Sequence, residues 1–183
     1  MKRLKKVAFN STLVVVDVQK DFSNFFTEEY LESLESYVSQ FPRVIVVVDD
    51  NSGDTDIPYF LKNCATDVLY KSYGGFEQEY IEELMEDGEI EIIKEDEVYK
   101  YGENLIVPGN VHENFLVPSD MVAVFKELQQ VTIVGGADQE CLDDVENALQ
   151  HLNVEVKRNN NLIYSFSNKN ENYLKEDYHW VKP

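Results

Sequence analysis

The stretch VTIVGGADQEC, residues 131–141, contains the features that decide the fold. Its four β-branched residues are typical of a buried strand, its two glycines allow a tight turn, and the polar residues after them favour the start of a helix. A strand that passes through a glycine turn into a helix is the repeating unit of parallel sheets. We therefore predict an α/β fold in which a sheet strand at 131–134 leads into a helix.

Short β-branched runs alternate with amphipathic stretches along the rest of the chain. This alternation is typical of a doubly wound, mainly parallel sheet that is buried on both faces. We predict a three-layer α/β/α domain with a six-stranded, mainly parallel sheet. The predicted strands are 12–18, 43–49, 67–70, 89–93, 131–134 and 154–157, and the predicted helices are 27–40, 77–86, 119–129 and 138–152, with N-caps at Thr27, Ser119 and Asp138.

No repeat and no linker divides the chain, so residues 1–183 are interpreted as a single domain. Residues 104–118 contain Pro108, Gly109 and Pro118 and are predicted to form a long irregular loop, which often serves as a lid. From residue 159 onward the chain is rich in Asn, Lys, Ser and Tyr. We interpret 159–183 as a C-terminal arm that packs on the domain or on a neighbouring subunit.

The composition excludes several classes of protein. The formal charge is −19, yet 43% of the residues are hydrophobic, which is too many for a disordered acidic chain. An acidic excess of this size disfavours binding to nucleic acid or to an anionic membrane. The basic residues at 1–6 are read as a solvated leader, and the two cysteines are too few for a disulfide framework. We expect a cytoplasmic protein whose partner is a small molecule.

Ligands bind at the carboxyl ends of the strands in open α/β sheets, and Cys141 lies just beyond such an end. In the first turn of a helix, the exposed N–H groups and the helix dipole favour a nucleophilic thiolate and could also bind an oxyanion. The alternative is that Cys141 is a small apolar residue that packs the helix start. Asp138 and Glu140 favour this alternative, because like charges raise the pKa of a thiol.

Asp17 and Lys94 are the other candidates at strand ends. Asp17 follows an apolar strand, where partial desolvation suits a general base, although a single Asp more often caps a turn. Lys94 follows Ile92 and Ile93 and is predicted to pair with Asp17; the alternative is a surface charge. It is the only cation in residues 72–99, which contain eleven acids: Glu77, Glu79, Glu82, Glu83, Glu86, Asp87, Glu89, Glu91, Glu95, Asp96 and Glu97.

Three motifs in this order resemble the isochorismatase-like cysteine hydrolase superfamily, which includes nicotinamidases. They are Asp-x-Gln-x-Asp-Phe at 17–22, a Lys that closes a middle strand, and Gly-Gly-Ala-Asp-x-x-Cys at 135–141, and the resemblance covers about residues 10–158. The resemblance implies a catalytic triad of Asp17, Lys94 and Cys141. It further implies a cis peptide at Gly136-Ala137, an oxyanion hole formed by the Ala137 and Cys141 N–H groups, and substrate-binding roles for Gln19 and Phe22.

The chain departs from nicotinamidases at the metal site. Asn51 and Asn63 stand where that group has two histidines, and the carboxylate and amide oxygens present fit zinc poorly, so we expect no metal and no cofactor. The sequence thus predicts a cysteine amidohydrolase that cleaves a small amide or carbamoyl substrate through a thioester. The alternatives are a non-catalytic binding protein and a nicotinamidase with a divergent metal site built on Asp49. The resemblance also suggests a homo-oligomer.

Overall fold

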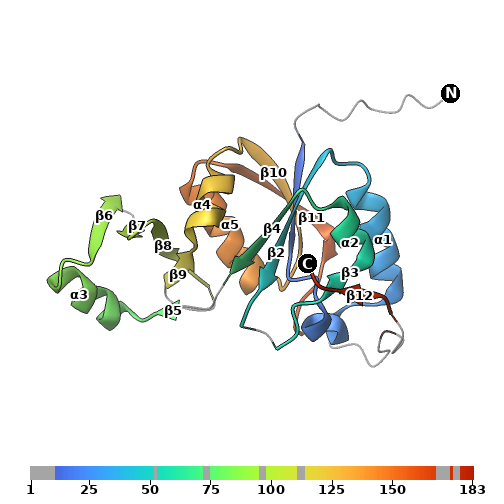
Figure 1. The fold of residues 1–183 in the computed structure, drawn as a ribbon, viewed down its shortest axis with the longest axis horizontal. Helices are drawn as coiled ribbons and strands as arrows, with labels where there is room; N and C mark the ends of the chain where they lie inside the picture. The colour runs from blue at the N-terminus through green and yellow to red at the C-terminus, as the bar shows by residue number, and fades with distance from the viewer. Residues whose placement is uncertain are drawn as a thin grey trace.

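The computed structural model describes residues 11–51, 53–71, 75–94, 98–110, 114–167, 174 and 178–183. Its centre is a five-stranded sheet in the order β11-β10-β1-β2-β4, with every neighbouring pair parallel (Figure 1). The strands are β1 (Thr12–Val16), β2 (Arg43–Asp49), β4 (Asp67–Lys71), β10 (Gln130–Gly135) and β11 (Glu155–Ile163). The expected α/β fold with a mainly parallel sheet is confirmed, but the sheet has five strands instead of six.

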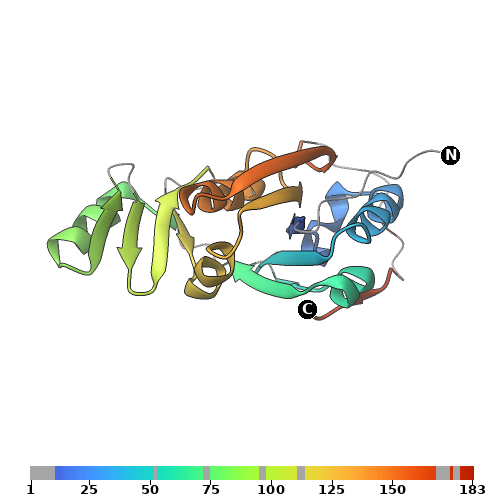
Figure 2. The ribbon, with the colours of Figure 1, turned by 90° about the horizontal axis from the view of Figure 1, so that it is seen from above.

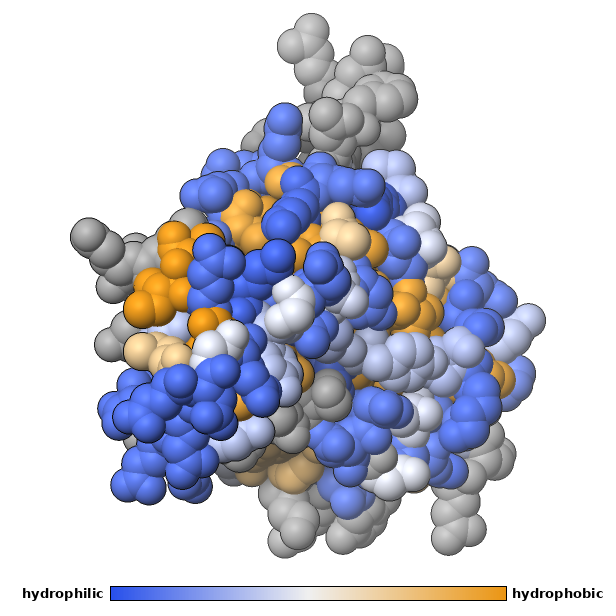
Figure 3. Space-filling model, turned by 60° about the vertical axis from the view of Figure 1, so that its left-hand side comes forward, coloured by the Kyte–Doolittle hydropathy of each residue, from blue (hydrophilic) through white to orange (hydrophobic). Residues whose placement is uncertain are grey.

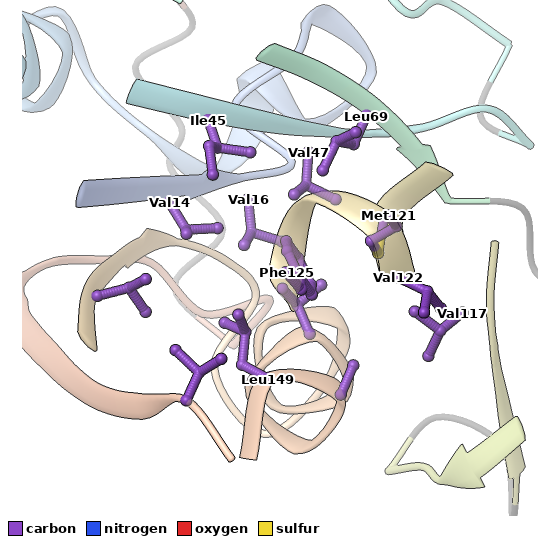
Figure 4. Close-up of a cluster of buried hydrophobic side chains, with 14 of the residues drawn as sticks. Val14, Val16, Ile45, Val47, Leu69, Val117, Met121, Val122, Phe125 and Leu149 are labelled. Atoms are coloured by element: carbon purple, nitrogen blue, oxygen red, sulfur yellow. The ribbon is translucent and has the colours of Figure 1, made fainter. Parts of the chain in front are cut away.

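Helices cover both faces of this sheet, as near-continuous apolar strands require. On one face, Leu13 and Val15 pack with α1 (Glu28–Val38) and α2 (Tyr59–Cys64). On the other face, Val14 and Val16 point toward Phe125 of α4 (Ser119–Phe125) and Leu149 of α5 (Cys141–His151) (Figures 2 and 4). Because side chains alternate along a strand, each strand contributes to both cores.

Two of the three predicted helix caps are wrong. Thr27 caps α1, since its hydroxyl accepts a hydrogen bond from the Tyr30 N–H at 3.2 Å. By contrast, α4 has Pro118 at its N-cap, and Ser119 is already the first helical residue. Asp138 lies in a turn before α5, whose N-cap is Glu140, and the Asp138 carboxylate is bound by Arg158 instead.

A second, antiparallel sheet extends away from the central one, in the order β5-β9-β8-β7-β6 (Figure 1). Helix α3 (Gln78–Glu86) packs on one of its faces through Ile81, and the opposite face contributes Val107 and Val117 to the core beneath α4. The strands are β5 (Gly75–Phe76), β6 (Ile90–Lys94), β7 (Val98–Tyr101), β8 (Asn104–Pro108) and β9 (Asn114–Val117).

This sheet overturns two predictions. Residues 89–93 are not a sixth strand of the parallel sheet, because β6 pairs only with the antiparallel β7. Residues 104–118 are not an irregular loop, since they contain β8 and β9. A missed signal is Gly102, which has a φ of +60° between the paired residues Tyr101 and Asn104; a glycine at that position closes a two-residue hairpin.

The end of the chain also differs from the expected arm. β11 continues through Ile163, so residues 159–163 belong to the central sheet. At the terminus, β12 (Trp180–Val181) pairs with β3 (Ile57–Pro58) of the same chain. The predicted leader at 1–6 lies outside the described residues. In the part of the chain that the structure describes, no helix has the length and apolar character needed to cross a bilayer.

Candidate active site

The candidate site lies at the switch point of the central sheet, where the order of successive strands reverses. β1 has β2 on one side and β10 on the other, so the carboxyl ends of β1 and β10 flank the point at which ligands bind in such sheets. Asp17 follows β1, and Asp49 and Lys71 end β2 and β4 in register with each other. Cys141 begins the helix that follows β10. Four chain segments therefore bring their polar residues to one edge.

The cation at this edge is Lys71, not Lys94. Its Nζ lies 3.0 Å from Oδ2 of Asp17 and 3.6 Å from Oδ2 of Asp49, and the side chain is 1% exposed. Lys94 ends β6, the edge strand of the second sheet, and the preceding Ile92 and Ile93 are 57% and 47% exposed. The prediction that Lys94 ends a buried strand and pairs with Asp17 is wrong.

The sequence signal for this lysine was ambiguous. Lys71 closes the strand DVLYK as Lys94 closes IEIIK, and both strands follow amphipathic or polar segments. Lys94 stands out in the sequence because it is the only cation among eleven acids in residues 72–99. Most described residues of this segment are exposed, so the excess of acids marks a surface and does not point to a buried ion pair. The better signal is that β2 and β4 are connected through α2 in a β-α-β unit, which places Lys71 next to Asp49.

Asp17 is completely buried, and its backbone adopts a left-handed conformation with a φ of +51°. Its N–H donates to the Val47 carbonyl at 2.9 Å, and its carbonyl accepts from the Tyr164 hydroxyl at 2.8 Å. Burial raises the pKa of its carboxyl group to about 6, although the Lys71 charge and a hydrogen bond from the Cys141 thiol oppose this shift. A carboxyl with a pKa near neutrality is well matched to proton transfer.

Cys141 is the first residue of α5 and is 2% exposed, and its thiol acts on the Asp17 carboxyl group to lower the pKa of that group. Of the two acids that weighed against a thiolate, Asp138 is neutralised by Arg158. The guanidinium of Arg158 lies 2.8 Å from Asp138, 2.6 Å from Asp143 and 2.5 Å from Glu146. A single cation thus offsets one of the three negative charges that surround it near the start of the helix.

The glycine turn before Cys141 is tightly packed. Gly135 has a φ of +103°, and a Cβ atom there would lie 2.1 Å from the Val16 carbonyl oxygen. A Cβ atom on Gly136 would lie 2.6–2.7 Å from the Tyr164 ring. The Tyr164 N–H donates to the Gly135 carbonyl, and the Tyr164 carbonyl accepts from the Asp138 N–H, both at 2.9 Å. The Gly136–Ala137 peptide is cis, as the resemblance implied.

Tyr164 therefore fixes both halves of the site, and sequence reasoning missed it. It holds the turn before Cys141 with its backbone and ring, and it holds Asp17 with its hydroxyl. Asp17 and Tyr164 are separated by 147 residues, so no local pattern connects them.

The two predicted oxyanion donors lie in this turn. The neighbouring N–H groups of Asp138 and Gln139 donate to Tyr164 and Asp143, respectively. In the described ranges, no group accepts a hydrogen bond from the Ala137 N–H. Cys141 is the first residue of α5, at the N-terminal end of the helix, where the helix dipole favours negative charge. The arrangement is suited to bind an oxyanion.

The two residues predicted to bind substrate have different surroundings. Gln19 is fully buried, and its amide group bonds both the N–H and the carbonyl of Asp49, at 2.8 and 3.1 Å. The structure thus shows Gln19 fastening the segment after β1 to the end of β2, and its contact with substrate stays a prediction. Phe22, in the 3-10 helix η1 (Lys20–Phe25), is half-buried with its ring 5.7 Å from that of Phe166. Its role as a pocket wall stays a prediction.

The residues at the expected metal positions do not converge. The Asn51 N–H donates to Oδ1 of Asp49, whereas Asn63 is exposed on α2. The ammonium of Lys71 lies beside the other oxygen of Asp49. Across the described ranges, no three His, Cys, Asp or Glu side chains are grouped so that they could hold a metal ion.

Comparison with known proteins establishes the fold alone. No protein-family model matches the chain, and no curated protein matches it. Among solved structures, the chain is similar to the MAR1 ribonuclease of Caenorhabditis elegans, with a TM-score of 0.50 and 14% sequence identity over 88% of this chain and 69% of that one. At this identity the similarity reflects a shared α/β architecture and carries no information about activity.

Proposed function

We propose that the protein is a cysteine hydrolase of the isochorismatase-like type that cleaves a small amide or carbamoyl compound through a thioester. The observation that carries the proposal is the contact of a buried carboxylate with both a thiol and an ammonium group, in Asp17, Cys141 and Lys71. Three groups of this chemistry at the switch point of a parallel sheet form a nucleophile, a base and a charge stabiliser.

The reaction begins with proton transfer from the Cys141 thiol to the Asp17 carboxylate. The thiolate attacks the substrate carbonyl, and the oxyanion accepts hydrogen bonds from the Ala137 and Cys141 N–H groups. Asp17 then gives its proton to the departing nitrogen, so that the C–N bond breaks and ammonia or an amine leaves a thioester. Water, deprotonated by Asp17, hydrolyses the thioester and restores the thiol.

Lys71 has two electrostatic roles in this proposal. Its ammonium limits the cost of ionising the buried Asp17, and it holds Asp17 and Asp49 in place between the strands. The ammonium of Lys71 also lies beside Asp49, the residue on which a divergent nicotinamidase would build its metal site. This contact favours metal-independent chemistry over that alternative.

The substrate is proposed to be small and uncharged. A net charge of −19 repels anions, and a neutral amide avoids this cost. Cys64 and Cys141 form no disulfide with each other, which is compatible with the proposed cytoplasmic location.

The test is ammonia release from a panel of small neutral amides by the wild type, by Cys141→Ala and by the matched control Cys64→Ala. We expect turnover by the wild type and by Cys64→Ala, and its loss in Cys141→Ala. Mass spectrometry of the quenched reaction should show an acyl adduct on Cys141.

Two outcomes would replace the proposal. If no amide turns over and the three proteins bind panel compounds equally, a non-catalytic binding protein is the better interpretation. If release occurs only from nicotinamide and stops when a chelator is added, the chain is a nicotinamidase with a divergent metal site.

A further inference from the structure

The outer end of the second sheet exposes an unusual combination of groups. β6 is the edge strand of that sheet, and its neighbouring residues Ile92 and Ile93 are both largely exposed. The register with β7 shifts between Ile92 and Lys94, so Ile93 is the extra residue of a β-bulge and β6 presents bare apolar surface at two adjacent positions. Ile92 lies opposite Tyr99, on the face that α3 covers, yet α3 leaves it 57% exposed.

Helix α3 adds further apolar surface beside this strand. Ile81 and Leu84 are buried against the sheet, whereas Tyr80 and Met85 are 45% and 39% exposed. At 100° per residue, Tyr80 and Met85 lie on the two borders of the buried stripe. Figure 3, in which this end of the molecule comes forward, shows hydrophobic surface broken up by hydrophilic residues. We call the exposed surface of α3 and β6 the outer patch.

The charge of the outer patch is predominantly negative, since Lys94 at the end of β6 is the only cation in the sequence of its two elements. The exposed acids along its two elements and the turns beside them are Glu77, Glu79, Glu82, Glu83, Glu86, Asp87, Glu89 and Glu91, and residues 77–93 contain no Lys or Arg. Exposed acids of this density repel a second copy of the same surface, but they attract a basic partner.

An edge strand is also a template for a further strand, and within the described residues β6 pairs with β7 alone. Its backbone N–H and C=O groups on the side away from β7 can pair with an extended chain, and natural proteins blunt such edges when they have no use for them. β6 ends in Lys94 and contains a β-bulge, two features that blunt an edge, but its exposed residues Glu91, Ile92 and Ile93 still present acidic and apolar groups there.

We propose that the outer patch is a docking site for a basic, extended segment of a partner protein, which adds to β6 as a further strand. Main-chain hydrogen bonds supply affinity, the exposed isoleucines take its apolar side chains, and the acids of α3 select for Lys and Arg. The proposal does not depend on the proposed hydrolase activity, because the site and this surface lie in different sheets.

The test uses a fluorescent peptide, Lys-Val-Lys-Ile-Lys-Val-Lys-Val, and the full-length chain, with binding measured by anisotropy. The control peptide has the same sequence with alternate backbone nitrogens methylated, which blocks strand addition and retains the charge. The variant Ile92→Thr/Ile93→Thr keeps β-branched residues in the strand. Tyr70→Thr is the matched control, because Tyr70 is a 38% exposed residue on β4, the edge strand of the central sheet.

We expect the unmodified peptide to bind the wild type and Tyr70→Thr equally, and to bind the double isoleucine variant on the order of tenfold more weakly. The methylated peptide should bind no better than that variant. Equal binding of both peptides overturns the proposal, as it indicates charge attraction alone. Absence of binding, or dimerisation of the chain that the double variant abolishes, overturns it as well.

Discussion

Asp17 links the three chemical groups of the site, because its carboxylate contacts Lys71 and Cys141 and its carbonyl accepts from Tyr164. Its left-handed φ of +51° is one that Asp tolerates better than most residues, and it turns the chain out of β1 toward the other partners. The backbone conformation thus places the carboxylate, and burial sets its proton affinity.

The raised pKa of Asp17 predicts a pH dependence. As the base, Asp17 must be ionised, so kcat/KM for an amide substrate should fall as the pH decreases through about 6, the pKa to which burial raises this carboxyl. Below that value the fall should approach about tenfold per pH unit. The measurement is kcat/KM between pH 4.5 and 8, a window chosen at roughly two units around the pKa. A rate that is constant down to the lower limit would contradict this role.

The lysines at the ends of β4 and β6 give a matched pair of substitutions. Lys71→Met should leave the buried carboxylates of Asp17 and Asp49 without their cation, lowering the free energy of unfolding by about 3–5 kcal/mol and abolishing activity. Lys94→Met should preserve both properties. Urea unfolding and amide turnover measure the two effects, and an equal loss in Lys94→Met would return the triad role to Lys94.

At the scale of elements, the turn between β10 and α5 is the most constrained segment of the site. Gly135 and Gly136 approach Val16 and Tyr164 too closely for any side chain, and this approach brings Ala137 and Cys141 under the end of β1. The two glycines of the motif that pointed to Cys141 in the sequence are therefore also required for close packing against Val16 and Tyr164.

Substitutions at two glycines separate the energetic cost of overpacking from the cost of a left-handed backbone conformation. Gly135→Ala should lower the free energy of unfolding by about 2–5 kcal/mol, the sum of left-handed strain and overpacking against Val16. Gly88→Ala carries the same left-handed penalty at a φ of +73°, but a Cβ there meets nothing within 4 Å, so about 1–2 kcal/mol is expected. Chemical denaturation of both variants gives the comparison, and equal losses would show that the contact with Val16 can relax.

Whether a segment forms a strand was easier to predict than which other strand it pairs with. The five strands of the central sheet overlap five predicted runs, although β4, β10 and β11 extend beyond them, because fully buried strands leave long β-branched sequences. Residues 89–93 were correctly predicted as a strand but assigned to the wrong sheet. A run of four or five apolar residues indicates a strand, whereas its neighbours depend on connections elsewhere in the chain. That single error moved the triad lysine from Lys71 to Lys94.

At the scale of the whole molecule, the charge of −19 is carried by an elongated shape in which the second sheet stands apart from the central one (Figures 1 and 2). Part of this charge has a defined place, since Arg158 gathers three acids at the start of α5. The outer patch has no such cation between residues 77 and 93. Negative charge is thus reduced by one arginine near the site, whereas at the far end it faces no cation over residues 77–93.

Self-repulsion should make stability depend on salt. Raising NaCl from about 10 mM to about 300 mM shortens the screening length from about 30 Å to below 10 Å and relieves repulsion among exposed acids. We expect Tm to rise by a few degrees, since about 1 kcal/mol corresponds to about 2–4 °C in a chain of this size. Calorimetry in NaCl and in KCl tests this, and a flat or falling Tm in both salts would contradict it.

The sequence by itself determined the α/β class, the central strands, and the positions of Asp17, Cys141 and the glycine turn, because each depends on neighbours within about ten residues of chain. Only the tertiary structure decided that Lys71 is the buried cation, that Gln19 holds two strands together, and that Tyr164 clamps the site from 147 residues away. The physical reason is that charge pairing and packing act through space. Strand order therefore determines which residues meet, and the sequence alone leaves that order open.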